Sequence, residues 1–193
     1  MAEGKAVIFS APSGSGKTTI VRHLLEHVAF PMGFSVSATT RPRRGREQDG
    51  VDYQFLSLDA FHERVAAGDF VEWEEVYPGT CYGTLRSELE RLWEAGETAL
   101  FDVDVEGGVN LRAALGERAM SVFIRPPSLA VLRARLVGRG TDSPEVIEER
   151  MRKAERELAY EDQFDVVLIN DDLETACREA VALVESFIAS SAP

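Results

Sequence analysis

The chain has 193 residues, two cysteines and a formal net charge of −12 at pH 7. This length fits one well-buried α/β domain and not two of full size, and the negative charge argues against nucleic-acid or acidic-membrane partners, so an anionic ligand needs a local basic site. Cys81 and Cys177 have neither metal-ligand nor disulfide spacing, and no apolar run reaches the ~20 residues of a membrane span, so we expect a cytoplasmic protein.

The first predicted elements are a strand at about residues 5–10, a glycine-rich loop and a helix that ends near residue 28. The loop reads Ala11-Pro12-Ser13-Gly14-Ser15-Gly16-Lys17-Thr18-Thr19. In such a loop backbone N–H groups and the helix N-terminus bind phosphate, while a lysine reaches the outer phosphates and a hydroxyl coordinates Mg²⁺. Ala11 stands where glycine is usual, but the extended backbone expected before proline tolerates alanine. We therefore predict a nucleotide-binding loop, with a plain Gly/Ser turn as the alternative.

Short elements separated by polar loops are predicted next. In chain order they are a strand at 34–37, an arginine-rich loop up to Gly50, extended structure at 53–56, a helix at 58–67 that Gly68 ends, and a strand at 70–73. Because this stretch has short strands and few long helices, we predict an inserted, mostly antiparallel subdomain.

Strands and helices alternate over the rest of the chain. The predicted elements are a helix from a Thr84 cap to Gly96, a strand at 98–105, a helix to about 115, a strand at 119–124, a helix from Ser128 to 137, another from Ser143-Pro144, a strand at 164–169 and a helix at 173–188. Strands separated by helices predict a mostly parallel sheet that is covered on both faces.

The helix that begins at Ser143 has a narrow apolar stripe. Its members are Ile147, Met151, Ala154 and Leu158, and the rest of the helix is charged. One narrow packed seam is typical of an arm that moves, so we predict a lid over residues 128–160.

Arginine, hydroxyl and carboxylate groups gather in the predicted subdomain. They are Ser37, Arg41, Arg43, Arg44, Arg46, Tyr53, Glu72, Tyr82 and Thr84. Guanidinium forks bind phosphate oxygens, which predicts a second phosphate site. One carboxylate can accept hydrogen bonds from both N1–H and N2–H of guanine, and a hydroxyl can donate to its O6. Adenine offers neither pattern. The alternatives are a solvated arginine loop and a solvent-facing Glu72.

Two acids interrupt an otherwise apolar predicted strand. Asp102 and Asp104 lie among alanine, leucine, phenylalanine and valine. Because burying a carboxylate without a partner is costly, we expect both to have partners.

Motifs along nearly the whole chain, from about Lys5 to Ile188, resemble those of guanylate kinases. They are the phosphate loop, residues 34–53, Glu72-Trp73, Tyr82-Gly83-Thr84, Asp102-Val103-Asp104, residues 135–140 and Asn170-Asp171-Asp172. The resemblance implies a P-loop NTPase three-layer α/β fold. Its parts would be a core of about 1–33, 84–127 and 161–193, a GMP-binding subdomain of about 34–83 and a lid of about 128–160.

The resemblance also implies an activity. It is the transfer of the γ-phosphoryl group of Mg·ATP to GMP, and also to dGMP, by a monomer or small homo-oligomer that uses neither nucleic acid nor membrane as a partner. Two alternatives stay open. One is a kinase of the same build that acts on another nucleoside monophosphate or a ribose bisphosphate, against which Glu72, Ser37 and Thr84 argue. The other is a noncatalytic module that binds phosphorylated peptides, against which the complete phosphate loop argues.

Individual roles follow from the same resemblance. ATP would be bound by residues 11–19, Arg135, Arg139 and Asn170, and GMP by Ser37, Arg41, Arg44, Tyr53, Glu72, Tyr82, Thr84, Asp102 and Asp104. The catalytic residues would be Lys17, Arg41, Arg139 and Arg150. Thr18 would hold Mg²⁺ directly, and Asp102 through water. We expect Arg139 and Arg150 to reach the phosphates only when the lid closes, and the long turn 77–81 leaves the placement of Tyr82 and Thr84 open by one residue.

Overall fold

The structure is a computed structural model that describes residues 4–138, 140 and 142–190. Arg139, which was expected beside the transferring phosphoryl group, lies outside the described residues. Among the helices of the described ranges, none combines the length and the apolar character that crossing a membrane requires.

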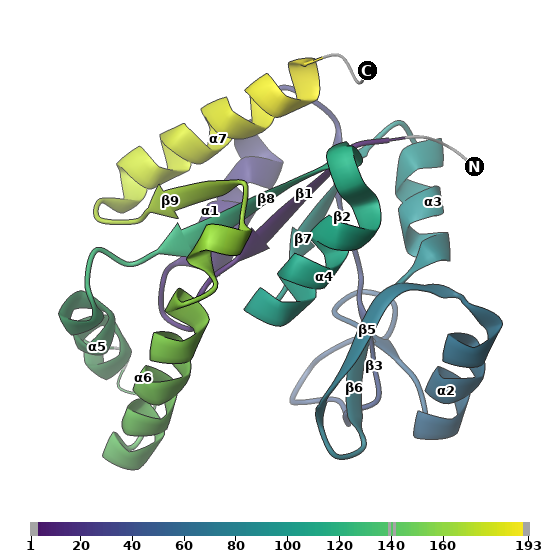
Figure 1. The fold of residues 1–193 in the computed structure, drawn as a ribbon, viewed down its shortest axis with the longest axis horizontal. Coiled ribbons are helices and arrows are strands. Elements are labelled where there is room, and N and C mark those ends of the chain that lie inside the picture. The colour runs from purple at the N-terminus through teal and green to yellow at the C-terminus, as the bar shows by residue number, and fades with distance from the viewer. Residues whose placement is uncertain (1–3, 139, 141, 191–193) are drawn as a thin grey trace.

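A five-stranded sheet forms the centre of the molecule (Figure 1). Its strands, in spatial order, are β2 (Met32–Phe34), β7 (Thr98–Asp102), β1 (Ala6–Ser10), β8 (Ala119–Arg125) and β9 (Val166–Ile169). All four pairings are parallel, which confirms the prediction of a mostly parallel sheet.

Helices cover both faces of this sheet, as an all-parallel sheet requires. On one face Val7 and Phe9 pack with α1 (Lys17–His27) and α7 (Leu173–Ala189). On the other, Ala6 and Ile8 pack with α3 (Arg86–Glu94) and α4 (Val105–Leu115). Successive side chains of β1 thus pack into the cores on opposite faces of the sheet. This confirms the predicted fold class, in which a layer of helices lies on each side of the central sheet.

The carboxyl ends of the central strands meet at one edge. Phe9 is paired with Asp102, so the phosphate loop that follows β1 begins beside the end of β7. Ligands of parallel α/β sheets bind outside the carboxyl ends of the strands. The topology therefore places the glycine-rich loop and the acids of residues 102–104 at the same edge.

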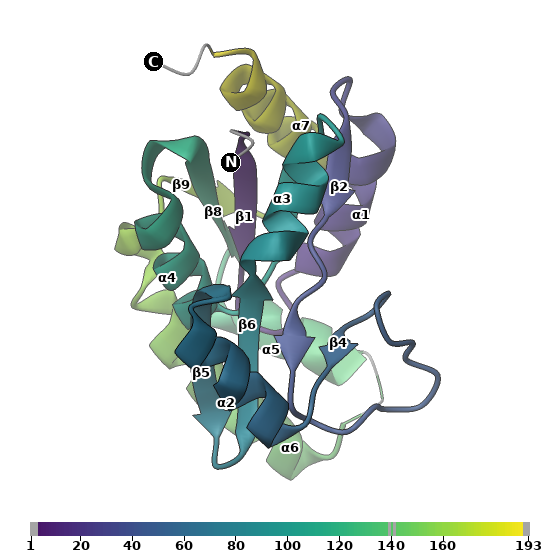
Figure 2. The ribbon, with the colours of Figure 1, turned by 90° about the vertical axis from the view of Figure 1, so that its right-hand side faces the viewer.

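A four-stranded sheet lies beyond this edge (Figure 2). Its order is β4 (Gln54–Phe55), β3 (Ala38–Thr39), β6 (Thr80–Leu85) and β5 (Phe70–Tyr77); β3–β4 is parallel and the other pairs are antiparallel. The helix α2 (Leu58–Ala67) covers it through Phe61, which packs against Phe70 and Cys81. Gly68 ends α2 in the left-handed conformation, as predicted.

Two helices, α5 (Leu129–Gly138) and α6 (Pro144–Leu158), project on the other side of the edge (Figure 1). They pack on each other through Leu132, Leu136, Ile147, Met151 and Ala154. Leu158, the last residue of the predicted stripe, instead packs near Phe123 and Phe164 of the core. The stripe therefore joins α6 to α5 along most of its length and to the core at its end.

Three predicted boundaries are wrong. The strand expected at 34–37 does not form, because Phe34 ends β2 on the central sheet and the chain then crosses to the second sheet. Thr84 lies within β6 and does not cap α3, which begins at Arg86. The strand expected at 98–105 ends at Asp102, because Asp104 caps α4 by accepting from the Gly107 amide.

The remaining predicted elements form with small shifts of their ends. Ser128 accepts from the Val131 amide at the start of α5, and Ser143 caps α6 ahead of Pro144, as predicted. The last strand begins at Val166 and not at Phe164, because a short 3-10 helix occupies residues 161–163. A second 3-10 helix, at residues 116–118, follows α4.

Candidate functional site

Two neighbouring cavities lie at the carboxyl edge of the central sheet. The acceptor cavity, of about 690 Å³, lies between the second sheet, the end of β7 and α6; its walls include Ser37, Arg44, Tyr53, Glu72, Tyr82 and Asp102. The phosphate-loop cavity, of about 470 Å³, is lined by all of residues 11–19 and by Tyr53, Asp102 and Asp104. Tyr53 and the two aspartates line both cavities, which therefore adjoin, whereas the predicted GMP-binding residues Arg41 and Thr84 are buried and line neither cavity.

Glu72 and Thr84 form a pair on neighbouring strands of the second sheet. They are directly opposite in the β5–β6 register, and the Thr84 hydroxyl donates to Glu72 Oε1 at 2.9 Å. Burial raises the pKa of Glu72 to about 7, while the Thr84 hydrogen bond opposes this rise. A half-buried carboxylate that accepts from the Thr84 hydroxyl retains capacity to accept from a ligand as well.

The long turn between β5 and β6 does not displace this pair. An irregularity in the register between Glu75 and Tyr77 absorbs the extra residue, and Gly79 adopts a left-handed φ of 76° at the turn. Tyr82 therefore lies opposite Glu74, and Thr84 opposite Glu72, which removes the one-residue ambiguity of the sequence analysis.

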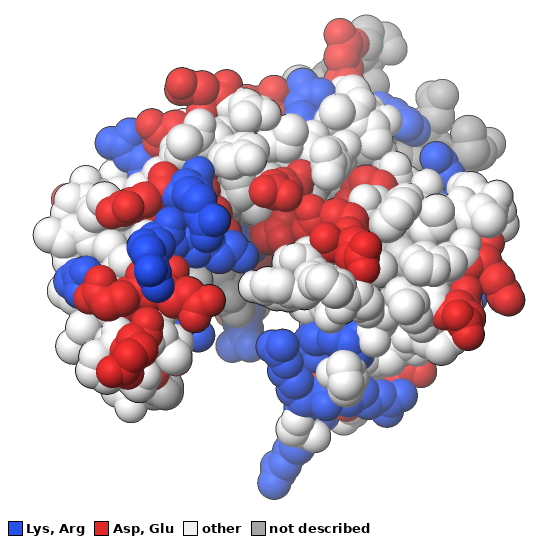
Figure 3. All heavy atoms as spheres, turned by 60° about the horizontal axis from the view of Figure 1, so that its bottom comes forward, with Lys and Arg blue, Asp and Glu red and all other residues white. Residues whose placement is uncertain are grey.

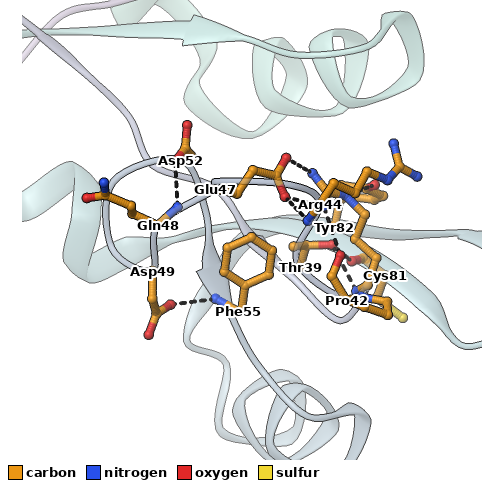
Figure 4. A network of polar contacts seen from close by, with 11 residues as sticks. Thr39, Pro42, Arg44, Glu47, Gln48, Asp49, Asp52, Phe55, Cys81 and Tyr82 are labelled. Atoms are coloured by element: carbon orange, nitrogen blue, oxygen red, sulfur yellow. Dashed lines mark hydrogen bonds and ion pairs between the residues drawn. The ribbon is translucent and has the colours of Figure 1, made fainter.

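Arg41 is held in a network of polar contacts within the arginine-rich loop, whose partners Glu47 and Tyr82 are labelled in Figure 4. Its guanidinium group donates twice to Glu47, at 2.7 Å each, and Nε donates to the Tyr82 hydroxyl at 3.1 Å. It also lies 4.7 Å from the centre of the Tyr53 ring, and the residue is only 7% exposed. Arg41 hence joins the two tyrosines that were predicted to bind GMP.

Glu47 is a site residue that the sequence analysis missed. Its hydrogen bonds with Arg41 and with the Arg44 amide lower the pKa of its carboxyl to about 2. An acid six residues after a buried arginine was the available signal, but the loop offers Asp49 and Asp52 as well. These two instead accept from the backbone amides of Phe55 and Gln48 and so shape the loop (Figure 4).

The phosphate loop has the backbone of a preformed cradle. Gly14 and Gly16 have φ of 99° and 93°, which side chains rarely adopt, and the Ser15 amide donates to the Pro12 carbonyl at 3.1 Å. The Ser15 hydroxyl is buried without a partner among the described residues. An orphaned buried hydroxyl in a cradle of amides fits a phosphate oxygen.

Lys17 lies at the start of α1 and is held by the end of β7. Its ammonium pairs with Asp102 at 2.6 Å and donates to the Val103 carbonyl. Asp102 therefore has the partner that the sequence analysis expected, and Asp104 has one in the Gly107 amide. Thr18 is exposed on the first turn of α1, beside the cavity.

Three predicted ATP-side residues meet at the back of the phosphate loop. Asn170 is 2% exposed, and its side-chain amide donates to the Ser15 carbonyl at 2.7 Å. Arg135 in turn donates to the Asn170 carbonyl at 2.9 Å. Both residues thus support the loop from behind and do not line the phosphate-loop cavity, and their contacts with ATP stay a prediction.

Arg150 already reaches the phosphate loop. Its guanidinium group donates to the Ser13 hydroxyl at 2.7 Å, and it also lies 3.4 Å from Asp142. The packing of α6 against α5 and the core brings this face of the helix to the loop, and the expectation that Arg150 reaches the phosphates only on lid closure stays a prediction.

Acidic and basic side chains that the sequence analysis did not single out complete the cavity walls. Glu74 follows Glu72 on the same face of β5, and burial together with the neighbouring Asp104 raises its pKa to about 8. Lys153 and Glu157, on α6, pair at 3.5 Å. Period-two spacing from Glu72 was the available signal for Glu74, and spacing of three from Arg150 was that for Lys153.

Comparison with known proteins agrees with this geometry. The family model described as guanylate kinase matches residues 3–187. A guanylate kinase of Bacteroides fragilis is 53% identical over 186 residues, which are 96% of this chain and 91% of the relative. One from Porphyromonas gingivalis is 46% identical over 185 residues, covering 96% of this chain and 98% of the relative. The crystal structure of guanylate kinase from Anaplasma phagocytophilum has a TM-score of 0.73 at 26% identity and covers 99% of this chain and 89% of that one.

Proposed function

The chain belongs to the guanylate kinase family and is thus an enzyme that phosphorylates GMP, and we propose that Mg·ATP is the donor and that the products are ADP and GDP. We propose dGMP as a second acceptor. The observation that carries the proposal is Glu72, which accepts from the buried Thr84 hydroxyl and lines a cavity that adjoins a complete phosphate loop.

Glu72 reads the base in this proposal. Its carboxylate accepts hydrogen bonds from guanine N1–H and N2–H together. The hydroxyls of Ser37 and Thr84 form hydrogen bonds with the remaining polar groups of the base. A site built to pair with these donors rejects a base that lacks them by about 10⁴-fold, since its own buried groups would otherwise stay unpaired. The cavity wall therefore favours GMP over AMP.

The acceptor phosphate is held by the arginine loop. Arg44 lines the acceptor cavity, and Arg41 exchanges its two bonds with Glu47 for bonds with phosphate oxygens. The Tyr53 and Tyr82 hydroxyls supply neutral donors beside it. Because the phosphate carries two charges and Glu47 one, the exchange is favoured when GMP binds.

The donor phosphates occupy the glycine-rich loop. Lys17 leaves Asp102 for the outer phosphates, and the orphaned Ser15 hydroxyl accompanies the backbone amides. The Thr18 hydroxyl would hold Mg²⁺, and Asp102, released by Lys17, would bind its water shell; the ion would supply positive charge against the phosphates. Arg150 and Arg139 complete the set of cations around the transferring group.

No general base is required, because the attacking atom is already an anionic phosphate oxygen. The residues therefore act by aligning two anions and neutralising the charge of the transferring group. We propose that residues 34–83 and the lid 128–160 approach each other to exclude water. The buried free thiols Cys81 and Cys177 support a cytoplasmic location, and a monomer or small homo-oligomer remains our proposal.

A coupled assay of ADP release, run with and without GMP, tests the function. We expect ADP release to depend on GMP and to be far slower with AMP or a ribose bisphosphate. The Lys17→Met variant should lose turnover by a factor of about 10³ or more, as when a principal charge-stabilising group is removed, while its Kd for GMP changes by less than about threefold. Faster turnover with another acceptor contradicts the substrate, and loss of GMP binding in folded Lys17→Met contradicts the division into two subsites.

A further inference from the structure

Lys153 lies where the cavities of the site meet. It lines the acceptor cavity, the phosphate-loop cavity and a third hollow of about 300 Å³ between β5, the start of α4 and α6. Asp104 lines the same three. A phosphoryl group that passes from the phosphate loop to the arginine loop must cross this junction, so a cation here lies beside its path.

The orientation of α6 is set by two independent contacts. Its apolar seam, at Ile147, Met151 and Ala154, packs against α5, and Arg150 touches Ser13 of the phosphate loop. Residues three apart on a helix share a face, so Lys153 lies one turn beyond Arg150 on the face that meets the core. Figure 3 shows basic and acidic side chains next to each other above a hollow, with a further group of basic side chains on its lower side.

The pairing that holds Lys153 in this state is weak. Its ammonium is 3.5 Å from Glu157 on the same helix, and its side chain is half exposed. A lysine that precedes its glutamate by four residues has the less favourable order, and at 3.5 Å the half-exposed ammonium is beyond good hydrogen-bond distance from a carboxylate whose side chain is only 13% exposed. Lys153 is therefore free to exchange Glu157 for a more strongly charged anion.

Lys153 is also close to the catalytic lysine. Glu157 lines the phosphate-loop cavity together with Lys153 and Lys17. Both ammonium groups oppose the rise that burial causes in the pKa of Glu157. The two lysines thus act on one carboxylate at the wall of the donor cavity.

The nearby acids do not account for Lys153. Asp102 is paired with Lys17, and Asp104 accepts from the Gly107 amide. Glu74 lines the acceptor cavity and the third hollow, and burial together with the neighbouring Asp104 raises the pKa of its carboxyl, which disfavours its charged form. Asp102 and Asp104 have partners other than Lys153, whereas two nucleotides bring several uncompensated phosphate charges to the same place.

We propose that Lys153 is a second catalytic lysine, whose ammonium leaves Glu157 when both nucleotides are bound and contacts the phosphate oxygens at the junction. The proposal rests on the transfer from ATP to GMP. In that step the bond from the γ-phosphorus to the bridging oxygen of the ADP leaving group breaks, and a bond to a GMP phosphate oxygen forms. Lys153 transfers no proton; it offsets the charge on the oxygens of the moving group, as cations do in other phosphoryl transfers.

Steady-state kinetics with Lys153→Met test this role. We expect kcat to fall about 10- to 100-fold, less than for a fully buried donor because the ammonium is half exposed, with the KM for each nucleotide within about threefold. Lys153→Arg should recover most of the loss. The matched control is Arg152→Met, which removes the neighbouring cation of α6 from a hollow on its outer side; its kcat should equal that of the wild type.

A bisubstrate analogue, in which a phosphate chain joins adenosine to guanosine, gives a second measurement. Lys153→Met should weaken its binding about tenfold or more while the Kd values of GMP alone and ATP alone stay near those of the wild type. Loss of kcat and of analogue affinity together supports the proposal.

Two results would overturn it. The first is a kcat of Lys153→Met equal to that of the wild type. The second is recovery of full activity in the double variant Lys153→Met with Glu157→Gln, because Lys153 would then serve only to neutralise Glu157. If the wild type itself fails to phosphorylate GMP with ATP, the proposed function fails, whereas an active wild type with an unaffected Lys153→Met contradicts this inference alone.

Discussion

The substitution Glu72→Gln separates the energetic cost of the buried carboxyl from its role in binding. Glutamine keeps the shape of the side chain and an oxygen that can accept from Thr84, and it removes the charge. Burial raises the pKa of Glu72 from 4.5 to about 7, which at about 1.4 kcal/mol per pKa unit corresponds to about 3 kcal/mol.

The direction of the pH effect follows from this rise. A carboxyl whose pKa is higher in the folded state contributes its full stability below pH 4.5, and that contribution is lost as the pH rises through about 7. Glu72→Gln has no such loss. Relative to the wild type it should therefore gain stability between pH 4.5 and pH 8.5, by up to about 3 kcal/mol.

Urea unfolding of the nucleotide-free protein at several pH values measures this difference. Glu63→Gln, an exposed glutamate on α2 of the same subdomain, is the matched control and should show no comparable trend. If the difference in the free energy of unfolding between Glu72→Gln and the wild type does not change with pH, the argument that the Glu72 carboxyl resists ionisation is refuted.

The same variant should bind GMP poorly. Loss of two charge-assisted hydrogen bonds raises the KM for GMP by about 10²-fold or more and leaves the KM for ATP within about threefold. In the wild type the KM for GMP should fall as the pH rises through about 7, because the ionised carboxyl accepts from guanine. Equal effects on both nucleotides would contradict the role of Glu72 as the reader of the base.

Two further substitutions test the loops. Glu47→Gln leaves the buried Arg41 without its counter-ion and should lower the Tm at neutral pH. Because the pKa of Glu47 is lowered to about 2, the stabilisation by this ion pair is present above pH 4.5 and is lost only as the pH falls through about 2. A Tm difference between variant and wild type that vanishes by pH 5 would contradict this role of Glu47. Gly16→Ala places a Cβ 2.3 Å from Asn170 Nδ2 at a φ of 93°. It should lose about 1–2 kcal/mol of stability because a residue with a Cβ adopts a left-handed conformation, further stability from the clash, and affinity for ATP. Gly50→Ala, at a φ of 74° in open space, should lose only the backbone contribution, so equal Tm changes in the two variants would contradict the close packing of the loop.

Signals within a few residues determined much of the fold in advance. The apolar run of β1, the glycine-rich loop and the start of α1 are consecutive in the chain, so the phosphate cradle could be predicted without tertiary information. The cap at Ser143 with Pro144 and the stop at Gly68 are likewise local, because each residue acts on the backbone next to it. The family resemblance rested on motifs of the same local kind.

Contacts between distant segments could not be predicted in this way. Thr84 resembles a helix cap within its own segment, and only pairing with β5 places it in a strand opposite Glu72. Phe34 belongs to the edge of the central sheet because Leu100, far along the chain, is its partner.

The amino-acid sequence by itself determined that this protein has a phosphate cradle and an arginine loop and singled out Glu72 as a candidate reader of the base, because each depends on residue types at short spacing. The tertiary structure alone decided which charges meet. It brings Asp102 to Lys17, Arg150 to Ser13 and Lys153 to the junction of the two cavities. These pairings depend on the parallel register at the sheet edge and on the packing of α6, which no local pattern specifies.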